Sequence, residues 1–269
     1  MKAGLANWKM HLVIQFTTFV LFPLIVLLAK PLFNESYFPL WLGVFFLAAL
    51  PSTVSSSVVM VSIAKGNMPA AIFNASLSSL IGIFITPLWT GLFIAADTGG
   101  FDTSKIVLKL CLQVLLPVIV GLVLHRYLGA FAEKHKKTLK MFDQAVILLI
   151  IYTSFCHSFA QHLFDNLGIT TILLLAVGMI GLFLAIFGLM NLISRMLGFS
   201  REDQVTVVFC GSKKSLVHGT VMSKVLFPDS TLAGIMILPL MLYHALQLIA
   251  ASIIAQKMGR QNSSTNTPK

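Results

Sequence analysis

Two polar stretches interrupt long apolar runs in this chain and decide its fold: LPSTVSSS at Leu50–Ser57 and VFCGSKKS at Val208–Ser215. Each combines a helix breaker, Pro51 or Gly211, with several hydroxyl or amine side chains. Such groups are costly at membrane depth unless they face protein or a water-filled cavity. The pattern therefore predicts two broken helices whose breaks lie inside the protein, although Pro51 alone could produce an ordinary kink.

The composition around these stretches is that of a membrane protein. Apolar residues make up 57% of the chain and charged residues 10%, whereas soluble domains carry about a quarter charged residues. Twenty residues without charge separate Lys9 from Lys30, and twenty-nine separate Glu35 from Lys65. A helix needs roughly 20 apolar residues to cross the hydrocarbon core. We therefore expect an all-α integral membrane fold.

The apolar runs predict about eight transmembrane helices, with both termini in the cytoplasm. The expected spans are Trp8–Ala29, Tyr37–Ala64, Met68–Ala95, Ile106–Leu128, Met141–Gln161, Ile169–Ile193, Asp203–Leu226 and Thr231–Gln256. Thirteen Lys and Arg residues fall on the side of the termini, and three (Lys30, Lys105 and Lys109) fall on the other. Basic loops favour the cytoplasm. We expect a multi-pass protein of the cell (plasma or inner) membrane.

The two broken spans occupy matching places in two triplets of opposite direction. Interrupted helices at corresponding positions of inverted repeats are the best sequence pointer to a transporter's binding site. We therefore divide the chain into repeat one (1–95, broken near 51–57), a panel-type helix pair (96–165), repeat two (166–257, broken near 210–215) and a disordered cytoplasmic tail (258–269).

At both breaks the sequence resembles the bile acid:sodium symporter superfamily, in its branch of symporter-like transporters. The stretch Leu50–Ala71 is similar to that branch's first crossover helix, and VFCGSKKSLVHG at Val208–Gly219 to its second. The stretch LPLMLYHALQL at Leu238–Leu248 is similar to its last helix. The resemblance implies a ten-helix fold with two broken, crossing helices, of which this chain lacks the first two helices.

The resemblance also marks positions at which this chain departs from sodium-coupled members. Those members carry a Glu, a Gln and an Asn where this sequence has Phe209, Lys213 and Lys214, and Val58 stands where an Asn is expected. No Asp or Glu lies deep in a core span, although sodium usually has a carboxylate nearby. We therefore do not expect sodium coupling. A lysine ammonium could take the place of a sodium ion, and coupling to Na⁺ or H⁺ remains the alternative.

The candidate binding residues lie at the breaks and on the spans beside them. Lys213 and Lys214 are mid-span, where a charged group is usually functional; the alternative is that they extend to an interface. Ser76 and Ser79 share a helix face that either lines a cavity or packs tightly. The expected substrate- or ion-binding set is Thr18, Thr53, Ser55, Ser56, Ser57, Asn74, Ser76, Ser79, Gly211, Ser212, Lys213, Lys214, Ser215 and His218.

These observations favour a secondary active transporter that moves an organic anion-like solute by alternating access. We expect a small-molecule solute and the lipid bilayer as partners, with no nucleic acid, cofactor or confident metal site. An intramembrane enzyme would need paired carboxylates or a metal cluster inside the spans, and the sequence has neither. The alternatives are a non-transporting membrane regulatory protein and an inactive, truncated transporter.

Overall fold

The computed structural model describes residues 7–98, 108, 112, 116–160, 167–227 and 230–264, and this part of the chain is helical with no strand. The elements are α2 (Trp8–Phe16), the π-helix η1 (Thr17–Leu21), α3 (Phe22–Leu28), the 3₁₀ turns η2 (Lys30–Leu32) and η3 (Glu35–Tyr37), α4 (Phe38–Ala49), α5 (Ser55–Ile63), α6 (Met68–Thr98), α8 (Leu116–Lys134), α9 (Lys136–Ala160), α10 (Ile169–Met196), α11 (Arg201–Gly211), α12 (Leu216–Leu226) and α13 (Ser230–Ser264).

Four helical segments in the described residues are long and apolar enough to cross a membrane: Trp8–Leu28, Met68–Phe93, Ile169–Met196 and Gly234–Arg260. They agree with four of the expected spans, and the chain is an all-helical membrane protein. The expected span at Ile106–Leu128 falls partly outside the described residues. The last helix continues to Ser264, beyond the expected end of its span at Gln256 and into the segment 258–269.

Both expected breaks are present. The helix α4 ends before Pro51, whose ring disfavours helical geometry in the preceding residue; Leu50 accordingly has extended angles, with φ −70° and ψ 154°. The helix α5 resumes at Ser55. The helix α11 ends at Gly211, and α12 begins after an extended Ser215 with ψ 114°. The expected spans Tyr37–Ala64 and Asp203–Leu226 are therefore each two half-helices.

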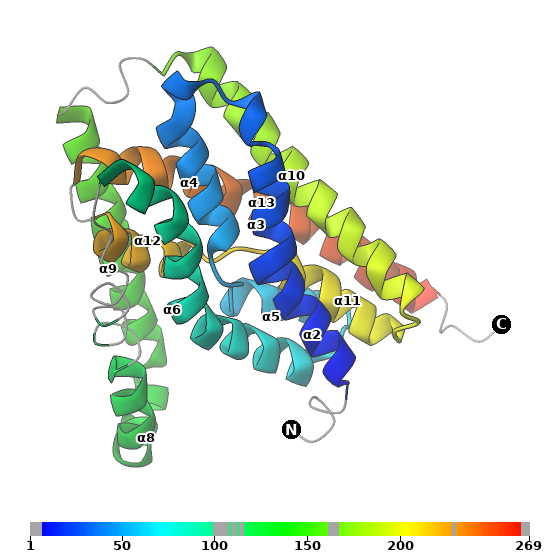
Figure 1. Ribbon diagram of the computed structural model, residues 1–269. Coiled ribbons are helices and arrows are strands. Elements are labelled where there is room, and N and C mark those ends of the chain that lie inside the picture. The colour runs from blue at the N-terminus through cyan, green and yellow to red at the C-terminus, as the bar shows by residue number, and fades with distance from the viewer. Residues whose placement is uncertain are drawn as a thin grey trace.

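The last helix, α13, is the centre around which the others pack. It contacts α4, α5, α9, α10 and α12. The approach to α4 is close because Gly43 has no side chain: a Cβ at this position would lie 3.1 Å from the Met236 Cα. In Figure 1 the half-helices α4 and α5 (blue to cyan) meet the chain that joins α11 to α12 (yellow) near the middle of the molecule. The packing places the two breaks in the protein interior.

Candidate functional site

At the first break, the backbone carbonyl groups of residues 47–51 each have a donor. The last carbonyls of a helix lack partners inside the helix. Here Leu50 N donates to Leu47 O (3.2 Å) and Thr86 Oγ1 donates to Ala49 O (2.8 Å). The two carbonyls of Ala48 and Leu50 accept from one amine, described below, and Pro51 O accepts from Ser215 N at 3.0 Å. The carbonyl groups at the end of α4 and at Pro51 are thus paired.

Side chains of the first break also complete the end of α11. Ser52 Oγ donates to Cys210 O at 2.7 Å, and Ser57 Oγ donates to Phe209 O at 3.2 Å. Ser52 and Ser57 are both fully buried. Together with the bond from Ser215 N to Pro51 O, these contacts join residues more than 150 positions apart. The two breaks therefore lie in direct contact and cross each other inside the protein.

The amine that reaches the first break belongs to Lys214. Its Nζ donates to Thr18 O at 2.8 Å, to Ala48 O at 2.6 Å and to Leu50 O at 2.8 Å. The same atom lies 4.3 Å from the centre of the Phe22 ring, close enough for a cation–π interaction. Lys214 is fully buried. Its side chain therefore connects the second break to the end of α4 and to η1.

Two features hold the Lys214 segment in place. Gln247, on α13, accepts from Lys214 N through Oε1 at 3.0 Å and donates to Lys214 O through Nε2 at 2.8 Å. The hydroxyl of Tyr243 donates to Ser212 O at 2.6 Å. At the other end, the π-helix η1 widens the backbone, as single π-turns do at functional sites. Its Thr18 and Phe19 carbonyls accept from Lys214 and from Trp89 Nε1.

Lys213 differs sharply from its neighbour. It too is fully buried, but its Nζ has no hydrogen-bond partner among the residues that the structure describes. The described titratable groups that interact with it electrostatically are Cys210 and His244, and neither is a carboxylate. A buried amine without partners is uncommon, because the loss of hydration is not compensated. Within the described residues, the crossing therefore contains one lysine amine with hydrogen-bond partners, Lys214, and one without, Lys213.

The remaining expected residues fall into groups. His218 lies in the first turn of α12, where its backbone N donates to Ser215 Oγ at 3.3 Å and its Nδ1 lies 2.9 Å from the same oxygen. Thr53 Oγ1 accepts from Ser56 Oγ at 3.3 Å. Thr18 is buried and donates through Oγ1 to Ile14 O at 2.8 Å, within its own helix. These residues stand at the break or beside it.

The expected polar face of α6 is only partly at the crossing. Asn74 is buried and lies 2.8 Å from His11 Nδ1. Ser79 is half-buried and donates to Ala75 O in its own helix at 3.0 Å, whereas Ser76 is exposed. At the break itself, α6 contributes Ser78, whose Oγ accepts from Ser52 N at 2.9 Å, and Thr86, which donates to Ala49 O. Ser55, in the first turn of α5, is exposed.

Several residues at the crossing were not in the expected set: Ser52, Ser78, Phe22, Tyr243 and Gln247. Ser52 belongs to the polar stretch at Leu50–Ser57, so its type and place were available signals. Gln247 is a polar residue in an apolar span, which is a recognised sign of function in membrane helices. Ser78, Phe22 and Tyr243 carry no signal that separates them from ordinary packing residues.

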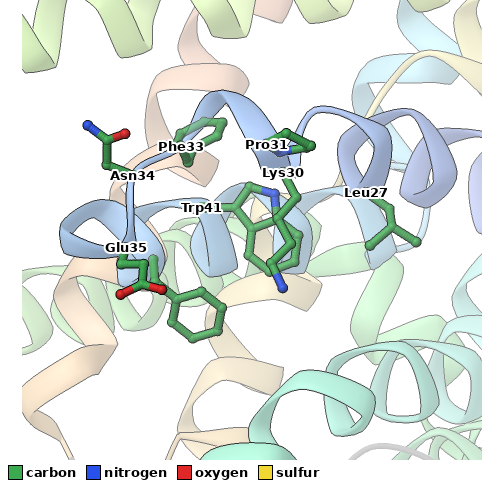
Figure 2. Close-up of a pocket in the computed structure, with 8 residues that line it drawn as sticks. Leu27, Lys30, Pro31, Phe33, Asn34, Glu35 and Trp41 are labelled. Atoms are coloured by element: carbon green, nitrogen blue, oxygen red, sulfur yellow. The ribbon is translucent and has the colours of Figure 1, made fainter.

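Among the described residues, two of the hollows lie away from the breaks and are lined by none of the break residues. One, of about 670 Å³, lies at the turn after α3 and holds the Lys30 side chain along Trp41, as Figure 2 shows. The Lys30 Nζ lies 5.2 Å from the Trp41 ring and 5.5 Å from that of Phe93. The other, of about 720 Å³, is an apolar groove between α3, α4 and α10. In this conformation Lys213 and Lys214 have no exposed surface, so the crossing is closed to solvent.

A model of the SBF-like CPA transporter family matches residues 1–260. The chain belongs to this family. Three relatives agree with that placement. An uncharacterized protein of Pseudomonas aeruginosa is 43% identical over 260 residues, which cover 96% of this chain and 78% of the relative. "Putative symporter YfeH" of Escherichia coli is 37% identical, with the same coverage. Sodium/bile acid cotransporter 7-A of Xenopus laevis is 32% identical over 93% of this chain and 74% of its own length.

Family membership confirms the resemblance that was based on the two polar stretches, and it identifies the chain as a membrane transporter homologue. At three of the four positions of departure, Phe209, Lys213 and Lys214, the structure shows what replaces the expected polar groups. Phe209 is fully buried and packs edge-on against Phe187, with ring centres 5.5 Å apart. Lys214 fills the crossing, and Lys213 stands beside it without a hydrogen-bond partner in the described part of the chain. This family member therefore has an amine-rich crossing.

Proposed function

We propose that this chain is a secondary active transporter that moves an organic anion-like solute by alternating access, with Lys213 as the residue that binds the anion. The observation that carries the proposal is the Lys213 Nζ, which is fully buried and has no hydrogen-bond partner in the described residues. An uncompensated buried charge costs several kcal/mol. A bound anionic group would remove most of that cost. The transporter family to which the chain belongs supports the same role.

The closed crossing supports alternating access. Lys213 has no exposed surface in this conformation, and neither hollow reaches it. A solute can therefore contact Lys213 only after neighbouring helices move. Transporters commonly achieve this by rocking one bundle against another around a fixed site. We propose that residues 1–95 and 166–257 form two inverted repeats around the crossing and that 96–165 contributes a panel-type helix pair.

In this proposal the protein has eight spans in the cell membrane, and both termini and the tail at 258–269 face the cytoplasm. The binding set proposed from the sequence keeps its place around the crossing, with Lys213 as its principal member. Sodium is not proposed as the coupling ion. The carboxylate of Asp203 is held by the amides of Asn7 and Asn67 at 3.0 and 2.9 Å, at the first turn of α11 and not at its break.

The experiment is solute flux in proteoliposomes. The purified chain is reconstituted, and uptake of labelled cholate, as an amphipathic anion, is measured against liposomes without protein. Labelled choline, a cation of small size, is the control solute. Cholate uptake above the protein-free level, without choline uptake, is the expected result. Uptake of cholate equal to the protein-free level would reject transport of this class and favour the non-transporting regulatory role.

A further inference from the structure

The surroundings of Lys214 Nζ have the composition of a site for a monovalent cation. Three backbone carbonyl oxygens lie 2.6–2.8 Å from this nitrogen. The centre of the Phe22 ring lies 4.3 Å from the same nitrogen. Carbonyl oxygens that replace a hydration shell are how selectivity filters hold monovalent cations. Lys214 is fully buried, and the three carbonyl oxygens and the ring face that contact its Nζ all attract positive charge.

The contacts also define the charge of the amine. An ammonium has three N–H donors and no acceptor, and here three acceptors lie within hydrogen-bond distance. A neutral amine has only two N–H groups, so its lone pair would face one of the three carbonyl oxygens. The geometry therefore fits the protonated form.

The carbonyls are available because of the local backbone. Ala48 and Leu50 lie at the end of α4, where carbonyls lack helical partners and carry the negative end of the helix dipole. Thr18 lies in the π-turn η1. None of the three belongs to the segment that carries Lys214, so the ammonium joins η1, α4 and the second break at a single point.

We propose that the Lys214 side chain is a tethered cation that fills a monovalent-cation site at the crossing, and that this site accepts a free cation when the side chain is shortened. The carbonyl oxygens of Thr18, Ala48 and Leu50 are the ligands, and the ammonium of Lys214, from the second break, takes the place of the ion. The protein thereby keeps the crossing neutralised without drawing an ion from solution. The three carbonyl oxygens would hold a cation in this way whether or not the protein transports a solute.

The test is thermal unfolding of Lys214→Ala in detergent, with added n-propylammonium. This amine has the atoms that the substitution removes, namely three carbons and the ammonium. Na⁺ and K⁺ are tested in parallel, and choline chloride keeps the ionic strength equal. We expect Lys214→Ala to have a lower Tm than the wild type. Its Tm should rise with the logarithm of the n-propylammonium concentration, as for any ligand of the folded state.

Matched controls separate this result from a general effect of amines. Lys213→Ala also removes a buried amine, but one that has no hydrogen bond to a carbonyl in the described residues. The Tm of Lys213→Ala and that of the wild type should therefore not change with added n-propylammonium. Lys214→Met keeps the volume of the side chain and leaves no space for an ion, so it should be destabilised and not rescued. A Lys214→Ala Tm equal to that of the wild type would overturn the proposal, as would no response to any of the three cations. If Lys214→Ala does not fold, a Lys214→Met Tm equal to that of the wild type would also overturn it.

Discussion

Lys213 and Lys214 are adjacent and both fully buried, so the same substitution at the two positions compares their roles directly. Methionine has nearly the length of lysine without its charge. Lys214→Met removes three hydrogen bonds to carbonyls and a cation–π contact. Lys213→Met removes no hydrogen bond to a described residue. We therefore expect Lys214→Met to lower stability and Lys213→Met not to lower it.

The expected size follows from the groups left behind. A buried acceptor that loses its partner costs about 1–3 kcal/mol, and three are affected. Part of this loss is offset because the mutant no longer buries an ammonium, which itself costs several kcal/mol. We estimate a net loss of about 3 kcal/mol for Lys214→Met from these opposing costs. That corresponds to a fall in Tm of roughly 6–12 °C for a domain of this size class. Lys213→Met removes the cost of burying an ammonium and loses no hydrogen bond to a described residue, so its Tm should be unchanged or higher.

The assay is thermal unfolding of both variants in the same detergent, followed by intrinsic tryptophan fluorescence. Trp41 is fully buried and packs against Phe45 and Phe93, so it reports on the core. Equal losses of stability in the two variants would refute the reasoning, because they would show that Lys213 has partners of the same strength as Lys214. A more stable Lys214→Met would refute it as well.

Two further predictions follow from the crossing. Ser52→Ala should lower the free energy of unfolding by about 1–2 kcal/mol, because the buried Cys210 carbonyl loses its side-chain donor; chemical unfolding measures this loss, the exposed Ser55→Ala is the control, and equal values for both would show that the contact contributes nothing. Cholate uptake into proteoliposomes should not rise steeply when choline is replaced by sodium, since a sodium site usually includes a carboxylate; a large sodium stimulation would show that carbonyls and hydroxyls suffice.

How far sequence reasoning could go is clearest at the two breaks. Pro51 and Gly211 mark the ends of α4 and α11 because their effects on the backbone are local and independent of the rest of the fold. The long apolar helices follow from composition in the same way. The crossing itself was expected from the arrangement of the two breaks in the chain and from the resemblance to the transporter superfamily.

The sequence could not show which of the two lysines has hydrogen-bond partners. Both are mid-span amines next to each other, and only the path of the non-helical segment 212–215 directs one toward the end of α4. The same limit applies to the serines. Which hydroxyl of a polar run meets a distant carbonyl depends on the partner helix, so Ser52 was missed and the exposed Ser55 was chosen. The π-turn at η1 has no local sequence signal in Thr17–Leu21.

The measurement that tests the central claim most directly is cholate uptake by Lys213 variants at equal amounts of reconstituted protein. We expect Lys213→Met to reduce uptake to the protein-free level while the protein still inserts, since loss of a charge makes the span more apolar. Lys213→Arg, which keeps the charge, should retain part of the uptake. Lys224→Met, which changes an exposed lysine of α12, should transport normally. Near-normal uptake by Lys213→Met would contradict the account, because it would show that the unpaired buried amine does not bind the solute.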